Sequence, residues 1–171
     1  MQRLLLTIVA LLASAPALAQ APVIEERDGA NGCWRRQYDA AHLAAHPDQQ
    51  VTAMSLALVY RDRADGYPYY AYTLDVALRN GRKGAASSTC DPMEGKLRCS
   101  VECDGGGVDV SRRDDGNVRV DLEAVGYIVL TGGCGSEEEE ETFELTSGLD
   151  DKLFLLHAVD AKQCKAMLPD W

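Results

Sequence analysis

The chain has 171 residues, of which 46% are hydrophobic, and its 27 acidic and 17 basic side chains give a net charge of −10. This length and apolar content suit one domain with a single core. The negative charge argues against nucleic acid and anionic membranes as partners, because both repel an acidic surface.

The first nineteen residues have the pattern of a secretory signal peptide. Arg3 precedes an apolar run over residues 4–12, and Ala17-Leu18-Ala19 resembles a signal-peptidase site. The run is shorter than the roughly 20 residues that span a bilayer, so we expect cleavage and no membrane span. We therefore predict a periplasmic or secreted protein, with a polar, flexible lead-in over residues 20–32 and one β-rich domain over residues 33–171.

A short helix is predicted at the start of this domain, followed by a long series of strands. Residues 35–45 are rich in alanine and contain no Gly or Pro, and Pro47 ends the helix. From residue 51 onward apolar and polar residues alternate, which indicates strands with one buried face. The alternation is clearest over residues 51–61 and 69–79, and the turn-rich linker between them predicts a hairpin.

Further short strands follow, separated by turns rich in Gly, Asp and Asn. They are predicted at residues 96–103, 107–112, 117–123, 127–130, 142–145 and 152–159, before a short helix at residues 160–168. The strand at 127–130 is continuously apolar and is expected to be more central. About eight strands with short links predict an all-β antiparallel fold, either an up-and-down barrel or a sandwich. The barrel is favoured because closure removes exposed sheet edges.

Six cysteines in an exported chain predict a disulfide framework. Cys90 and Cys99 flank a turn sequence, and Cys103 and Cys134 both lie in glycine-rich strand ends, so each pair is a candidate bridge. The remaining pair, Cys33 with Cys164, would tie the N-terminal segment to the C-terminal one. Metal binding is the alternative for Cys99 and Cys103, whose spacing is ligand-like, but no second Cys or His pair accompanies them.

No pattern in the sequence indicates a metal, cofactor or catalytic site. His42 and His46 would share one face of the predicted helix, but two ligands do not make a site. His157 lies in an apolar strand with nothing nearby in the sequence to pair with. The five glutamates from Glu137 to Glu141 predict a solvated loop, with a weak patch for cations or a basic partner as the alternative.

The best binding candidate is a tyrosine cluster around the predicted hairpin turn. Tyr60, Tyr70 and Tyr72 fall on the apolar faces and are expected in the core. Tyr67 and Tyr69 flank a proline at the tip, where exposed amphipathic rings suit contact with a sugar, peptide or protein. The alternative for this pair is packing over the barrel mouth.

These observations predict a non-catalytic, monomeric binding protein whose partner is an unidentified protein or small ligand. The first alternative is a small-ligand carrier, which requires inward side chains too small to fill the barrel. The second is a hydrolase with two carboxylates, which requires acidic residues that face inward. Asp109, Asp121 and Glu123 alternate onto the outward face, which disfavours the hydrolase.

Overall fold

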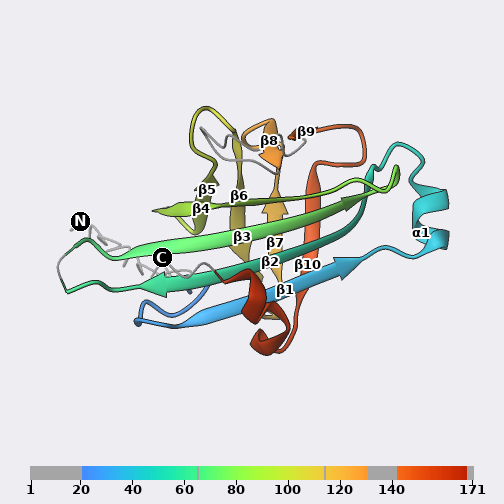
Figure 1. Ribbon diagram of the computed structural model, residues 1–171. Helices are drawn as coiled ribbons and strands as arrows, with labels where there is room; N and C mark the ends of the chain where they lie inside the picture. Colours follow the sequence, from blue (N-terminus) through green and yellow to red (C-terminus); the bar gives the residue numbers. More distant parts are fainter. Residues whose placement is uncertain (1–20, 65, 114, 131–141, 169–171) are drawn as a thin grey trace, which may run out of the picture.

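Ten strands and two short helices form the part of the chain that the structure describes (Figure 1). The computed structural model describes residues 21–64, 66–113, 115–130 and 142–168. The strands are β1 (Asn31–Gln37), β2 (Val51–Arg61), β3 (Tyr69–Leu78), β4 (Lys83–Met93), β5 (Lys96–Ser100), β6 (Gly107–Arg112), β7 (Val118–Asp121), β8 (Tyr127–Leu130), β9 (Phe143–Thr146) and β10 (Leu153–Ala158). The helices are α1 (Ala40–Ala45) and the 3-10 helix η1 (Ala161–Met167).

Eight of these strands close into an antiparallel barrel. Strands β1 to β7 pair in sequence order, and β10 joins β7 to β1, so the predicted up-and-down connectivity is confirmed. In Figure 1, β1, β2 and β3 run across the view, while β6, β7 and β10 run nearly upright behind them. The barrel is therefore flattened, with two layers of strands that cross over a shared core.

The alternating pattern of the sequence accounts for the longest hairpin. Strands β2 and β3 pair with Leu56 opposite Leu74 and Leu58 opposite Tyr72, and all four side chains are buried. Large side chains from other strands and from β8 meet them in one core cluster. The fully buried members include Met54, Leu122, Ile128, Leu130, Phe154 and Leu156.

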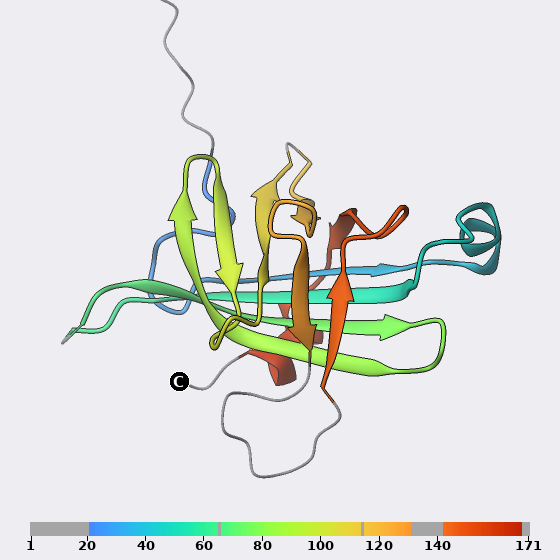
Figure 2. The same ribbon diagram turned by 90° about the horizontal axis from the view of Figure 1, so that it is seen from above.

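Strands β8 and β9 form a separate two-stranded sheet that lies across one end of the barrel (Figure 2). Residues 127–130 are thus a strand as predicted, but the expectation of a central position in the main sheet is wrong. Ile128 and Leu130 are apolar because they plug the barrel end and join its core. The plug needs space on β4, where a Cβ added to Gly84 would lie 2.7 Å from the Phe143 ring and 2.9 Å from Leu130.

The predicted helix over residues 35–45 is wrong in its first half. Residues up to Gln37 belong to β1, which pairs with β2 from Asn31 to Gln37. Burial of Trp34 and pairing on the sheet outweigh the weak helix preference of this segment. Only Ala40–Ala45 is helical, and the Asp39 side chain caps it by accepting a hydrogen bond from the His42 backbone N–H at 2.7 Å.

The lead-in predicted over residues 20–32 also needs correction. Strand β1 already begins at Asn31, and the preceding residues have no regular structure but are not loosely attached. Val23 and Ile24 are buried in the barrel core, so this segment covers the barrel end opposite the β8–β9 plug.

Strand β4 was not predicted, because its inward side chains are small. The inward residues Gly84, Ala86 and Ser88 are small, and the residues between them, Ala85 and Ser87, are no more polar, so no hydrophobic period of two is visible. The turn predicted between Cys90 and Cys99 is correspondingly shorter than expected, and β4 continues as far as Met93.

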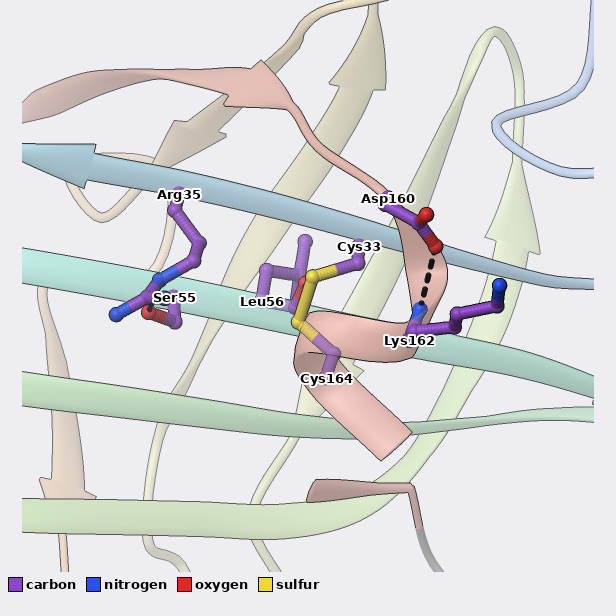
Figure 3. Close-up of a disulfide and its surroundings, with 7 residues drawn as sticks. All are labelled: Cys33, Arg35, Ser55, Leu56, Asp160, Lys162 and Cys164. Atoms are coloured by element: carbon purple, nitrogen blue, oxygen red, sulfur yellow. Dashed lines mark hydrogen bonds between the residues drawn. A yellow bond between two sulfur atoms is a disulfide. The ribbon is translucent and has the colours of Figure 1, made fainter. Parts of the chain in front are cut away.

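Two of the three predicted disulfides lie within the described residues and are confirmed. Cys90 and Cys99 lie directly opposite each other on β4 and β5. Cys33 on β1 is bonded to Cys164 on η1, which holds η1 against the outer side of β1 and β2 (Figure 3). Cys103 is disulfide-bonded as well, but it lies in a turn with a positive φ and not on the predicted strand. Cys134 lies outside the described residues, as does the acidic run from Glu137 to Glu141.

Candidate functional site

The tip of the β2–β3 hairpin is the most exposed aromatic site among the described residues. Tyr67 is 93% exposed, which is the largest value for any large apolar side chain described. The hairpin extends well beyond the body of the barrel in the view from above (Figure 2). Tyr67 therefore stands clear of the barrel and is open to contact from several sides.

The base of this hairpin is braced by aromatic packing and by the N-terminal segment. The Tyr60 and Tyr70 rings, directly opposite on β2 and β3, meet edge to face with centroids 5.0 Å apart. The Tyr70 hydroxyl donates to Glu26 at 3.0 Å, and the Tyr60 backbone N–H donates to the Ala30 carbonyl at 2.8 Å. Burial, followed by this hydrogen bond, raises the pKa of Tyr70. The hairpin is thus anchored on both strands, which limits the conformational entropy lost on binding at the tip.

The two tyrosines predicted to be exposed differ in the structure. Tyr69 is only half-buried, lies opposite Arg61 in the hairpin ladder, and has an interaction partner. The expectation of a freely exposed ring therefore applies to Tyr67 but not to Tyr69. Tyr69 is the first residue of β3 and is paired in the ladder, whereas Tyr67 precedes the strand.

A small hollow lined by both apolar and polar residues lies at the same end of the barrel. It has a volume of about 320 Å³ and lies between the N-terminal segment and the β4–β5 hairpin. Its lining includes Pro22, Val23, Tyr70 and Met93, and Met93 is largely exposed. Tyr70 is three residues from Tyr67, which corresponds to about 10 Å along an extended strand. The tip and the hollow are therefore close enough to contact one partner together.

The barrel interior is filled by large side chains. The inward side chains that are at most 2% exposed include Tyr72, Phe154, Met54, Leu56, Leu58 and Leu74. The carrier hypothesis requires the opposite, namely inward side chains too small to fill the barrel. The Tyr72 hydroxyl is buried without a hydrogen-bond partner among the described residues, and burial raises its pKa.

The acidic residues considered for hydrolysis lie on the outer surface, as the alternation predicts. Asp109 on β6 pairs with Asp121 on β7, and both flank inward valines. Asp109 is nevertheless 3% exposed, because Lys96 and Arg98 of β5 cover it and form ion pairs with it. Burial opposes its ionisation, but the hydrogen bonds from Arg98 and Lys96 outweigh this and lower its pKa. Glu123 forms an exposed ion pair with Lys152 at 2.6 Å.

The histidines are engaged in stacking and hydrogen bonds. His42 stacks between Tyr38 and His46, with ring centroids 4.6 Å and 4.4 Å away. His157 lies 2.6 Å from an Arg36 nitrogen across the β1–β10 junction. The spacing that places His42 and His46 on one face also applies to Tyr38, four residues before His42, so this signal was present in the sequence. Within the described residues, no group of three or more His, Cys, Asp or Glu side chains could hold a metal ion.

Comparison with protein-family models, curated proteins and solved structures finds no match to this chain. The structure therefore defines this protein by its architecture alone. It is a disulfide-bonded, eight-stranded up-and-down barrel with a two-stranded plug. In the part of the chain that the structure describes, no helix is long and apolar enough to cross a membrane.

Proposed function

We propose that this protein is an exported, non-catalytic binding protein that contacts a partner macromolecule through the tip of the β2–β3 hairpin. The observation that carries the proposal is Tyr67, a 93% exposed aromatic ring at the end of a hairpin braced at its base. A tyrosine offers a large amphipathic contact area with few rotatable bonds, and such rings are enriched among residues that dominate binding energy. The hollow beside Tyr70 would receive an apolar side chain of the same partner.

The proposed location outside the cytosol rests on the signal-like N-terminus and on the disulfides. Disulfides persist in oxidising compartments such as the periplasm or the extracellular space. N-terminal sequencing of the protein exported by its own cell should give Gln20 as the first residue. A chain that retains Met1 and stays in the cytosol would contradict this part of the proposal.

Site-specific photo-crosslinking tests whether the tip of the β2–β3 hairpin contacts a partner. A photoreactive phenylalanine analogue is placed at position 67 in the native host, and at position 149 as a control. Leu149 is also highly exposed, at 78%, but lies in the loop between β9 and β10. We expect a discrete crosslinked species from position 67 that position 149 does not give. No species from position 67, or the same species from both positions, would refute the tip as the contact surface.

A matched pair of substitutions tests whether the contact contributes affinity. Tyr67→Ala should weaken capture of the crosslinked partner by at least about tenfold, since aromatic interface residues cost about 2 kcal/mol or more when truncated. Leu149→Ala should leave capture unchanged. Equal capture by the Tyr67→Ala variant and the unsubstituted protein would show that Tyr67 does not contribute to the affinity for the partner.

A further inference from the structure

The outer face of β7 and β10 carries an apolar pair directly beside a charge pair. In the ladder between these strands, Leu153 lies opposite Asp121 and Leu155 lies opposite Arg119. The alternating residues of both strands, such as Val120 and Phe154, face the core. The four outward side chains therefore form a two-by-two grid, which we call the β7–β10 patch: Arg119, Asp121, Leu153 and Leu155.

The β7–β10 patch is exposed to solvent, and one of its charged side chains has no partner among the described residues. Leu153, the first residue of β10, is 50% exposed, and Leu155 is 42% exposed. Arg119 is exposed, and within the described residues it has no ion pair or hydrogen bond through its side chain. One Asp121 oxygen accepts a hydrogen bond from the Ala124 backbone N–H at 3.0 Å. The helix η1 packs against β1 and β2, on another part of the barrel wall.

The grid is complementary to itself under a two-fold rotation. An axis that lies between the two copies, parallel to the patch, perpendicular to the strands and midway between the two rows, exchanges the rows. It places Leu153 of one copy over Leu155 of the second copy, and Arg119 of one over Asp121 of the other. Each contact occurs twice, as an isologous interface requires. After the rotation each Arg119 side chain faces an Asp121 carboxylate of the other copy, and an arginine and a carboxylate form charge-assisted hydrogen bonds.

We propose that this protein forms a symmetric dimer through the β7–β10 patch. The partner is a second copy because the rotation exchanges the row of Arg119 with the row of Asp121, so that opposite charges meet in each half of the interface. The patch is small, so association is weak and depends on concentration. Added salt also favours it at first, because two chains of net charge −10 repel each other over long range.

The dimer goes beyond the proposed binding function and does not depend on it. The sequence alone predicts a monomer. The β7–β10 patch forms only when residues 119–121 and 153–155 pair in the sheet, and the sequence does not show this pairing. In a dimer, two hairpin tips belong to one particle, so a partner with repeated sites would be bound with avidity.

Sedimentation equilibrium of the disulfide-bonded protein, from about 10 μM to 1 mM, measures the association over the range expected for a small interface. We expect a weight-average mass that rises from monomer toward dimer. Leu155→Asp should abolish the rise. Arg119→Asp and Asp121→Arg should each weaken association by at least about tenfold, because each places like charges opposite one another. The double variant Arg119→Asp/Asp121→Arg should restore it.

Two controls and a second measurement keep the test independent of folding. Leu149→Asp and Lys162→Asp make the same charge changes at exposed positions outside the patch, and should associate like the unsubstituted protein. Dilution of the unsubstituted protein should shift amide NMR resonances of β7 and β10 more than those of β2 and β3. A protein that stays monomeric at 1 mM, a double variant that fails to recover, or dilution shifts confined to other strands would each overturn the proposal.

Discussion

Removal of the Asp109 charge should destabilise the barrel strongly at neutral pH and much less in acid. In Asp109→Asn the side chain keeps its shape but loses the charge that Lys96 and Arg98 share. Asp109 is almost completely buried, whereas Lys96 and Arg98 are 35% and 31% exposed. The two cations would therefore regain water, so the loss lies below that for a fully buried pair. Hydrogen bonds to charged groups are worth about 1.5–3 kcal/mol, which gives about 2–3 kcal/mol at pH 7.

The pH dependence follows from the direction of the pKa shift. The pKa of Asp109 is lowered from 3.8 in the folded protein, so the unfolded chain binds this proton more tightly. The stabilisation is fully present above about pH 4 and is lost as the pH falls through the lower folded-state pKa. Urea denaturation at pH 7 and near pH 2.5, for both proteins, measures the difference. An equal difference at both pH values, or none at pH 7, would refute the assigned role of Lys96 and Arg98.

Other substitutions test the plug, the tether, the core and the tip. Gly84→Ala should lower the free energy of unfolding by about 1–3 kcal/mol, because the new Cβ would collide with the Phe143 ring; an unchanged urea midpoint would mean that the plug moves aside freely. Replacement of Cys33 and Cys164 by serine should cost about 2–5 kcal/mol in the same assay, and a smaller loss would show that η1 packs as well without its bond. Tyr72→Phe should leave stability unchanged or raise it by up to about 1 kcal/mol, since its hydroxyl has no partner among the described residues; a clear loss would reveal a hidden one. Tyr67→Ala should change stability by no more than about 0.5 kcal/mol, so that any loss of capture reflects contact and not unfolding.

The fold class was predictable because apolar and polar residues alternate along most strands of the barrel. The largest apolar side chains of β2 and β3 fall at every second position and face the core, and a turn-rich linker of seven residues joins the two strands. Strand β4 was not predictable, because its inward side chains are small and the residues that require them to be small lie elsewhere in the chain. Gly84 faces Phe143 and Leu130, which reach it only when the β8–β9 plug is in place. A prediction from a short stretch of sequence cannot detect contacts with residues so far along the chain.

The candidate site was predictable only where local geometry decides exposure. Tyr67 precedes a proline at the hairpin turn, and a turn residue outside both strands has no neighbour to cover it. Tyr69 starts a strand, so its surroundings depend on the residues paired with it. The burial of Asp109 and the make-up of the β7–β10 patch depend on strand register, which relates residues that are distant in the sequence.

The junction between β1 and β10 has a consequence for how the chain folds. It consists of two residue pairs, Trp34 with Ala158 and Arg35 with His157, whereas β2 pairs with β3 along their whole length. Contacts between distant residues carry the larger loop-closure cost, so we expect the hairpins to form first and this junction to close last. Cys33 and Cys164, 131 positions apart, lie beside it. Their oxidation therefore marks the end of folding, and alkylation of free thiols during refolding would time the closure of the barrel.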